Sequence, residues 1–222
     1  MKLMADAAEM TDTDFRDLLE KIEQLKNSEV KKLVDARINE FKELGKKSDN
    51  EIFSELCFCI LTANFNAERS IKIQNDIKSG FCNLMESQLV EKLRQHGHRF
   101  PEARAKYIVE ARGHKDSLKE LFENFKNETG LREWLAKNVR GLGYKEASHF
   151  MRNIGFTGVA IVDFHIIDLL VKYKLIEWTK TLTPKKYLEI ENLLREIAKK
   201  VNLNLAELDL YLWYIETGKV LK

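Results

Sequence analysis

The residue types best suited to chemistry in this chain lie in one short segment. Gly141, Leu142 and Gly143 form a Gly-x-Gly unit, Lys145 follows two residues later, and Asp163 comes 18 residues after that lysine. Backbone N–H groups exposed at the start of a helix bind anions, and a lysine amine can act as a nucleophile. A fixed carboxylate can stabilise positive charge that develops on a reacting group. The spacing therefore predicts a site that holds an anion beside a covalent nucleophile.

Two amphipathic helices should position this segment. Apolar residues recur at helical intervals across Gly130–Asn138 and again across Tyr144–Ile154, which predicts a helix on either side of the two glycines. Glycine permits positive φ and close approach of another backbone, and Leu142 can fill the gap between the helices. The N–H groups that begin the second helix then favour a phosphate. A plain turn between two helices explains the same glycines equally well.

Lys145 and Asp163 each have a structural alternative to a chemical role. Lys145 lies in the first turn of the second helix, where the helix dipole disfavours a cation and so favours the neutral amine. Because the chain has 37 lysine and arginine residues, an ordinary solvated side chain is the alternative. Asp163 precedes an apolar stretch that predicts a helix, so it is a good N-cap. Capping and catalysis are compatible, since the cap holds the carboxylate in one orientation.

The segment VRGLGYKEASHFMRNIGFTGVAIVD (139–163) resembles the helix-hairpin-helix and Gly/Pro-Asp loop of the base-excision DNA glycosylase superfamily. The loop has Gly158 and Asp163 but lacks a proline, in a variable part of that pattern. Three further segments resemble the type 2 8-oxoguanine DNA glycosylase/AP lyases of archaea and some thermophilic bacteria: Asn50–Gln74, His98–Arg112 and the C-terminal LYLWYIETGKVLK. The similarity covers the chain from about residue 50 to its end.

This resemblance implies a two-step reaction on DNA. A base stacked in a duplex must be extruded before its sugar can be attacked. Lys145 is then the nucleophile at C1′, while Asp163 stabilises positive charge on the sugar and assists proton transfer. The resulting Schiff base permits β-elimination. We therefore expect an enzyme that excises a base and cuts the strand 3′ to the abasic site.

Binding of the DNA backbone is expected at the hairpin, through Arg140, Gly141, Leu142 and Gly143. The net charge of only +2 is weak evidence for a nucleic-acid partner, because such binding needs a local basic face rather than a large total charge. Lysine and arginine do gather in or near the motifs, in the sets Arg99/Arg104/Lys106 and Lys137/Arg140/Lys145 and at Arg152.

Base recognition requires a hydrogen-bond acceptor near N7–H of 8-oxoguanine, together with flat surfaces for stacking. The resemblance points to Phe100 and Trp213 as the stacking pair and to the C-terminal Lys222 as a group that reaches the base. Its ammonium is a donor and its terminal carboxylate an acceptor. Asp209, one turn before Trp213, is a further candidate contact. The alternatives are that the two aromatics belong to the core and that the chain end is frayed.

Helical periodicity extends along the whole chain, and no segment predicts a convincing strand. The other expected helices are Asp14–Lys26, Val30–Leu44, Asn50–Asn64, Ala67–Ser79, Ser87–Gln95, Pro101–Ala111, Ser117–Asn124, Phe164–Tyr173, Pro184–Val201 and Leu205–Thr217. The expected fold class is all-α, with two helical lobes and the active site in the cleft between them. Residues 50–154 should form the lobe that ends in the helix-hairpin-helix. N-terminal helices within residues 1–49 should pack with the C-terminal lobe, residues 155–222.

Composition restricts the cofactors and the cellular context. Cys57 and Cys59 lie in an apolar run and, with Cys82, predict reduced thiols in a cytoplasmic protein rather than a metal site. No cysteine cluster follows them, which argues against the iron–sulfur cluster of some relatives. No cofactor or metal is expected. The absence of a long apolar run or an N-terminal apolar region predicts neither a membrane span nor a secretion signal. We expect a monomer that acts on double-stranded DNA containing 8-oxoguanine, alongside the chromosome of a prokaryotic cell.

Two other functions fit parts of the pattern. A non-catalytic helix-hairpin-helix DNA-binding module would explain Gly141 and Gly143 but would place no demand on Lys145 or Asp163. A lyase-type glycosylase for another oxidised base would keep Lys145 and Asp163 but not the subfamily-like C-terminus. His149 and His165 flank the motif, and we interpret both as packing or phosphate neighbours rather than as bases.

Overall fold

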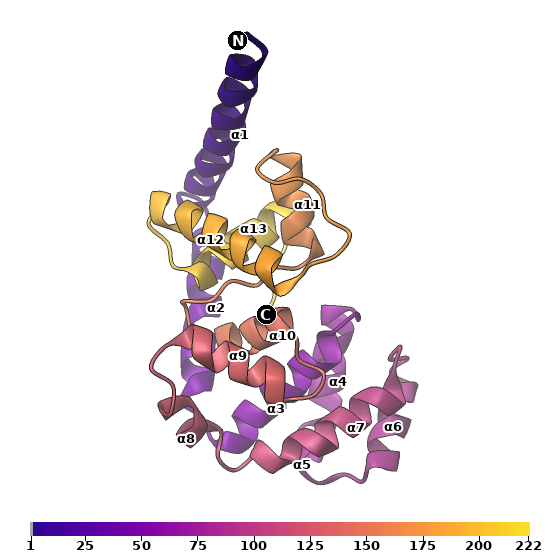
Figure 1. Ribbon diagram of the computed structural model, residues 1–222. Coiled ribbons are helices and arrows are strands. Elements are labelled where there is room, and N and C mark those ends of the chain that lie inside the picture. Colours follow the sequence, from indigo (N-terminus) through magenta and orange to yellow (C-terminus); the bar gives the residue numbers. More distant parts are fainter. Residues whose placement is uncertain (1) are drawn as a thin grey trace. The chain divides into compact units, whose positions relative to one another are not determined.

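The computed structural model describes the backbone of residues 2–222 and the side chains of residues 13–222 (Figure 1). Its helices are α1 (Lys2–Lys26), α2 (Val30–Gly45), α3 (Asp49–Thr62), α4 (Ala67–Ile77), α5 (Gly80–Asn83), α6 (Glu86–Gln95), α7 (Pro101–Ala111), the 3-10 turn η1 (Arg112–His114), α8 (Leu118–Glu123), α9 (Glu128–Asn138), α10 (Tyr144–Asn153), α11 (Phe164–Lys172), α12 (Pro184–Lys200) and α13 (Leu205–Thr217). The all-α prediction is confirmed, because the described residues contain no strand. None of these helices is long and apolar enough to cross a membrane.

Helix ends differ from expectation where a side chain or an unusual backbone angle decides them. Helix α9 begins two residues before the expected Gly130, because the Asn127 side chain accepts the Gly130 N–H at 2.8 Å and caps the helix. Helix α4 ends at Ile77, since Lys78 adopts φ 50° and leaves the helical conformation. The short helix α5, which follows at Gly80, and the turn η1 were not predicted.

The chain divides into two units of contacts. The aspartate unit comprises residues up to Asn39 and from Ala160 to Leu221, and the hairpin unit comprises Glu40–Val159 together with Lys222. The boundaries fall after residues 39 and 159, whereas the sequence patterns suggested 49 and 154. Residues 40–45 join the hairpin unit because the end of α2 packs on the end of α10, where the Arg152 guanidinium lies 5.0 Å from the Phe41 ring.

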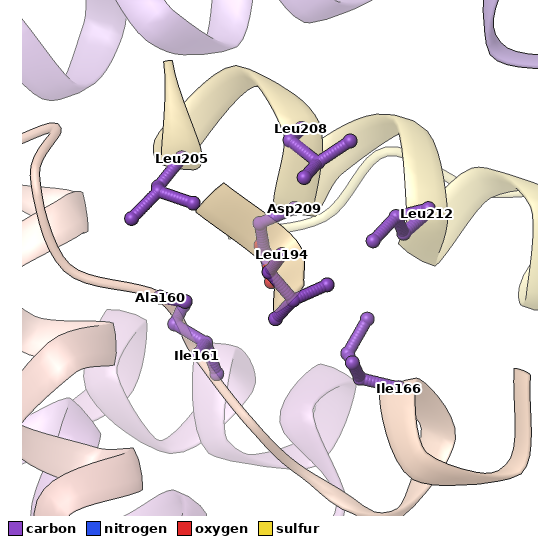
Figure 2. Close-up of a pocket in the computed structure, with 8 residues that line it drawn as sticks. All are labelled: Ala160, Ile161, Ile166, Leu194, Leu205, Leu208, Asp209 and Leu212. Carbon is purple, nitrogen blue, oxygen red and sulfur yellow. The ribbon is translucent and has the colours of Figure 1, made fainter. Parts of the chain in front are cut away.

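In the aspartate unit, α13 packs against α1, α11 and α12. Its N-cap Asn204 accepts from the Glu207 N–H, and Gly218 ends the helix in the left-handed conformation. Figure 2 shows side chains from α11, α12, α13 and the segment Ala160–Ile161 around a small cavity. The lining is apolar except for Asp209, so this interior is a packed core that supports the segment leading to Asp163.

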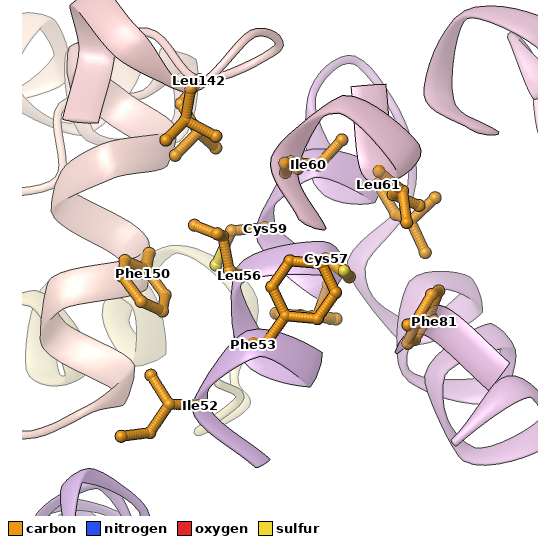
Figure 3. Close-up of a cluster of buried hydrophobic side chains, with 14 of the residues drawn as sticks. Ile52, Phe53, Leu56, Cys57, Cys59, Ile60, Leu61, Phe81, Leu142 and Phe150 are labelled. Carbon is orange, nitrogen blue, oxygen red and sulfur yellow. The ribbon is translucent and has the colours of Figure 1, made fainter. Parts of the chain in front are cut away.

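In the hairpin unit, α3 is the central helix. It packs against α4, α5, α7, α8 and α10, and its residues from Leu56 to Thr62 are all buried. A capping box between Ser48 and Glu51 starts the helix. Figure 3 shows Phe53 and Leu56 of α3 in one cluster with Phe150 of α10 and Leu142 of the hairpin. The hairpin and the helix that carries Lys145 are therefore fixed to the core of this unit.

Candidate active site

The hairpin between α9 and α10 is anchored by its central residue. Leu142 is only 6% exposed and belongs to the core cluster, as the sequence predicted for the gap between the helices. Its N–H donates to the Val139 carbonyl at 3.2 Å, which closes the turn after α9. Gly143 then begins α10 as its N-cap, with its carbonyl accepting from Ala147 at 2.9 Å. The flanking glycines are thereby held in one backbone geometry.

The two glycines of the hairpin differ in whether their backbone angles require glycine. Gly141 has φ 94°, and a Cβ on it would lie 2.6 Å from the Tyr107 side chain. Gly143 has φ −97° and ψ −169°, which any residue can adopt. Only Gly141 therefore needs glycine for its backbone angle. Arg140 is exposed, pairs with Glu110 at 3.3 Å and stacks over Tyr107 at 4.9 Å, so its guanidinium is oriented at the surface of the turn.

One hairpin amide is already engaged within the chain. The Gly143 N–H donates to Glu146 Oε2 at 3.2 Å, and Glu146 Oε1 lies 3.8 Å from Lys145 Nζ. A carboxylate thus occupies the place at the start of α10 where the sequence predicted a phosphate. The helix dipole favours any anion there, so Glu146 and a phosphate would compete for the same amide.

Lys145 lies in the first turn of α10, as predicted. Its side chain is 25% exposed, so it is partly shielded from water yet accessible. The next turn of the helix is buried, with Ala147, Ser148 and His149 facing the interior. This arrangement fixes the root of the lysine and leaves its amine near the surface, as a nucleophile requires.

Asp163 is the N-cap of α11. Its side chain accepts the Ile166 N–H at 3.0 Å, which confirms the predicted capping geometry. The preceding backbone is held by α12: the Ala160 N–H donates to Glu191 at 3.0 Å, and the Tyr187 hydroxyl contacts both the Ala160 carbonyl at 2.7 Å and the Val162 N–H at 3.2 Å. Asp163 therefore lies between the segment that is hydrogen-bonded to α12 and the start of α11, which it caps.

Phe100 precedes α7 and is 37% exposed, so its ring is available for stacking. Its backbone N–H donates to His98 Nδ1 at 3.1 Å, and His98 Nε2 hydrogen-bonds to the Leu61 carbonyl at 3.0 Å. The guanidinium groups of Arg99 and Arg104 lie 5.1 and 5.8 Å from the ring. Phe100 is thus an oriented aromatic surface with cations beside it, rather than part of the hydrophobic core.

Trp213 and Asp209 lie one turn apart on α13, in the aspartate unit. The Trp213 ring is partly exposed and meets His165 edge to face, with centroids 4.7 Å apart. Its indole N–H is buried and has no hydrogen-bond partner among the described residues. Asp209 is 8% exposed and lines the cavity of Figure 2, whose volume of about 10 Å³ has room for a water molecule but not for a base.

Lys222 is not frayed. Its Nζ lies 2.7 Å from Glu55 Oε2, 2.6 Å from Gln74 Oε1 and 4.1 Å from the centroid of the Phe58 ring. The side chain is 18% exposed. The ammonium is therefore committed to the protein, which differs from the expectation that it serves as a donor to the base. The terminal carboxylate is the group of Lys222 that remains for that purpose.

His149 lies where several candidate groups meet. Burial lowers the pKa of His149 well below its usual range, and the positive charges of Arg152, Lys145 and Lys222 lower it further. A hydrogen bond to the Lys222 backbone acts in the opposite direction but does not reverse the shift. The ring also packs edge to face on Phe58 at 5.6 Å. His149 is thus a neutral packing residue next to the chain end, consistent with the prediction that it is no base.

The polar group that the sequence analysis missed is Glu55, with Gln74 and Asn153 around it. A carboxylate in the middle of an otherwise apolar buried helix was the available signal, because buried acids are rare unless they are paired. The structure brings Lys145 and Lys222 together in the hairpin unit, around His149, while Asp163, Asp209 and Trp213 belong to the aspartate unit. Among residues 13–222, no group of three His, Cys, Asp or Glu side chains could hold a metal ion.

Nearly the whole chain is similar in sequence to known proteins. The family described as "8-oxoguanine DNA glycosylase" matches residues 34–203. The 8-oxoguanine DNA glycosylase/AP lyase of Methanocaldococcus jannaschii is 56% identical over 92% of this chain and 99% of its own. That of Korarchaeum cryptofilum is 51% identical over 93% and 98%.

Solved structures give the same result. The crystal structure of the Methanocaldococcus jannaschii 8-oxoguanine glycosylase/lyase in complex with 15mer DNA containing 8-oxoguanine matches with a TM-score of 0.90 over 92% of this chain and 99% of that one, at 56% identity. The 8-oxoguanine DNA glycosylase of Thermotoga maritima matches with a TM-score of 0.88 over 94% and 100%, at 42% identity. With its hairpin and its capped aspartate on an all-helical fold, the chain belongs to the 8-oxoguanine DNA glycosylase family.

Proposed function

We propose that this protein excises 8-oxoguanine from double-stranded DNA and then cleaves the strand 3′ to the abasic site by β-elimination. Relatives named 8-oxoguanine DNA glycosylase/AP lyase, at up to 56% identity among those compared, support both activities. The observation that carries the proposal is the placement of Lys145 directly after the hairpin, in the first turn of α10, with 25% of its side chain exposed. An amine there is close to any strand whose phosphate is held by the hairpin.

The chemistry begins with extrusion of the damaged nucleotide, which exposes C1′. Lys145 Nζ forms a bond to C1′ as the glycosidic bond to the base breaks, and the electron pair of that bond leaves with the base. Asp163 stabilises the positive charge that grows on the sugar and assists proton transfer. The sugar ring opens to a Schiff base with Lys145, which acidifies the C2′ hydrogen. Loss of that proton expels the 3′ phosphate, and hydrolysis then frees the lysine.

Binding of the DNA backbone is assigned to Arg140 and to the hairpin residues Gly141, Leu142 and Gly143. Oriented N–H groups and the positive end of the α10 dipole favour a phosphate without reading sequence. Leu142 contributes by anchoring the turn in the core, where it is 6% exposed. The Glu146 carboxylate, which now accepts from Gly143, must give way when a phosphate arrives.

Recognition of the base is assigned to Phe100, Trp213, Asp209 and Lys222. The exposed ring of Phe100 and the partly exposed ring of Trp213 are each suited to stacking on an extruded purine. The terminal carboxylate of Lys222 is an acceptor for N7–H, which 8-oxoguanine has and guanine lacks. Asp209, one turn before Trp213 on α13, is a further candidate contact in this scheme. The enzyme is proposed to act as a monomer, without a cofactor, on the chromosome in the cytoplasm of a prokaryotic cell.

Borohydride trapping tests the proposal directly, because it converts the Schiff base into a stable covalent adduct. Duplexes should carry 8-oxoguanine, an oxidised pyrimidine or an abasic site opposite each normal base. Lys145→Gln should abolish trapping and lower excision by at least about 10³-fold, on the order of 4 kcal/mol of barrier, while DNA binding survives. Lys199→Gln, at an exposed lysine in the last turn of α12, is the control and should trap normally.

The same experiment separates the alternatives. Trapping on oxidised pyrimidine but not on 8-oxoguanine would assign the enzyme to another lesion. Binding without any trapping would leave a helix-hairpin-helix DNA-binding module. Full trapping by the Lys145→Gln variant would remove that lysine from the mechanism.

A further inference from the structure

Glu55 is the least expected side chain in the hairpin unit. It is 2% exposed in α3, where every other buried residue except Thr62 is apolar. A buried carboxylate is costly unless hydrogen bonds and a counter-charge compensate for its lost hydration. Both oxygens of Glu55 are used: Oε1 accepts from Asn153 Nδ2 at 2.7 Å, and Oε2 accepts from Lys222 Nζ at 2.7 Å and from Gln74 Nε2 at 3.1 Å. Its charge partner is the last residue of the chain.

Gln74 completes the binding site for that ammonium. Its Nε2 donates to the Ser54 carbonyl at 3.0 Å, so the side-chain amide is oriented with its oxygen away from Ser54. That oxygen accepts from Lys222 Nζ at 2.6 Å. The Phe58 ring closes the site, with its centroid 4.1 Å from the same nitrogen. A carboxylate, an amide oxygen and an aromatic face therefore surround one ammonium group.

Glu55, Gln74 and Phe58, which surround the Lys222 ammonium, are called the clamp below. Residues of α10, the helix that carries Lys145, hold the clamp in place. Arg152 donates to Asn153 Oδ1 through Nε at 3.1 Å and through its terminal nitrogen at 2.9 Å. These bonds orient the Asn153 amide so that its nitrogen points at Glu55. On the same helix, His149 hydrogen-bonds to the backbone of Lys222. The last residue is consequently held at its ammonium and at its backbone, whereas an unrestrained chain end frays.

We propose that Glu55, together with Gln74, is a positioning residue for base recognition: it captures the Lys222 ammonium and thereby presents the terminal carboxylate to the extruded 8-oxoguanine. Glu55 acts through Lys222 and touches neither the base nor the sugar. This inference rests on the proposed function, in which that carboxylate accepts from N7–H. It assigns the ammonium to anchoring and the carboxylate to recognition.

The first test is independent of activity. A carboxypeptidase specific for basic C-terminal residues should release Lys222 slowly from the wild type and at least about 10-fold faster from Glu55→Gln, as followed by mass spectrometry. Circular dichroism and the Tm establish that the variant is folded. Equal release from the two proteins would show that Glu55 does not hold the chain end and would overturn the proposal.

The second test separates base recognition from the lyase step. Single-turnover excision of 8-oxoguanine should fall roughly 5- to 150-fold in Glu55→Gln, the range expected for one misplaced polar contact. Cleavage at a preformed abasic site should change less than about 3-fold, because it needs Lys145 but no base. Lys222→Met, which keeps the terminal carboxylate but removes the ammonium, should give the same split. Lys219→Met, at an exposed lysine of the same tail, should behave as the wild type.

A double-mutant cycle decides whether Glu55 acts through Lys222. The variant Glu55→Gln/Lys222→Met should be no worse than Lys222→Met alone, since the clamp is already empty in the single variant. Additive losses, or equal losses of excision and abasic cleavage, would overturn the proposal in favour of a general structural role. If Glu55→Gln does not fold, Gln74→Ala takes its place in each comparison. A wild type inactive on both DNA substrates would instead refute the proposed function, and the carboxypeptidase result would still report on the clamp.

Discussion

Asp163 combines two roles that one substitution can separate. Its carboxylate caps α11 through a 3.0 Å hydrogen bond from the Ile166 N–H, and it is proposed to stabilise the cationic sugar. Asp163→Asn retains a side-chain carbonyl at the same position, so the capping bond can still form. Asp163→Ala removes both the bond and the charge. The pair of variants therefore distinguishes a cap from an electrostatic stabiliser.

The cost to stability follows from the geometry. Asn is as good an N-cap as Asp, so Asp163→Asn loses only the interaction of its charge with the helix dipole, about 0.3–1 kcal/mol. For a chain of this size that corresponds to a Tm decrease of roughly 1–4 °C. Asp163→Ala also loses the cap, about 1 kcal/mol more. Both variants should remain folded at assay temperature.

The cost to activity should be much larger than the cost to stability. Loss of a preorganised charge at a developing cation typically lowers the rate by about 10²-fold or more, which is roughly 2.7 kcal/mol of barrier. Single-turnover excision of 8-oxoguanine at saturating enzyme measures this directly, because binding and product release do not limit it. Asp168→Asn, at an exposed acid on the same helix, serves as the control for an altered net charge.

The outcome that refutes this reasoning is specific. If Asp163→Asn is folded and excises within about 3-fold of the wild type, the carboxylate is only a cap. If Asp163→Asn is normal but Asp163→Ala is slow, the hydrogen bond to Ile166 rather than the charge matters for excision.

Three further predictions follow from the hairpin and from α10. Gly141→Val should disturb the hairpin, because φ is 94° at this position and a Cβ would meet Tyr107. Fluorescence anisotropy should show equally weakened binding to damaged and undamaged duplex, since phosphate contacts carry no base information. Gly143→Val, in extended backbone, should weaken binding less, and a larger effect of Gly143→Val would contradict this prediction. Glu146→Gln should raise DNA affinity a few-fold at low salt and less at high salt, because it removes the carboxylate bound to the Gly143 N–H. Folding lowers the pKa of His149, so below about pH 6.5 the unfolded chain binds a proton at this residue that the folded chain does not. The contribution of this group to the free energy of unfolding should be constant above about pH 6.5 and should fall below it by up to roughly 1.4 kcal/mol per pH unit. Denaturant titration at several pH values measures this slope, which should be smaller in His149→Phe.

Local sequence patterns determined most of the secondary structure. Helices α7 and α13 have the bounds predicted for Pro101–Ala111 and Leu205–Thr217, because a proline at the first turn and a glycine after the last residue define them. The period of the apolar residues placed α3 at the core, and the Gly-x-Gly spacing placed Lys145 at a helix start. These features depend on residues within a few positions of one another, which is why a single sequence suffices to predict them.

The tertiary structure decided how the site is supported. The Glu55 carboxylate and the Lys222 ammonium are 167 residues apart in the chain, and no periodicity relates them. The sequence indicated a role for Lys222 but did not decide whether its ammonium or its carboxylate meets the base, because the partners Gln74 and Phe58 become visible only when the helices pack. Hydrogen bonds and ion pairs of this kind require side chains to meet in three dimensions, within about 3 Å. Local patterns therefore identify the groups that can do chemistry, while packing determines which of their atoms remain free to do it.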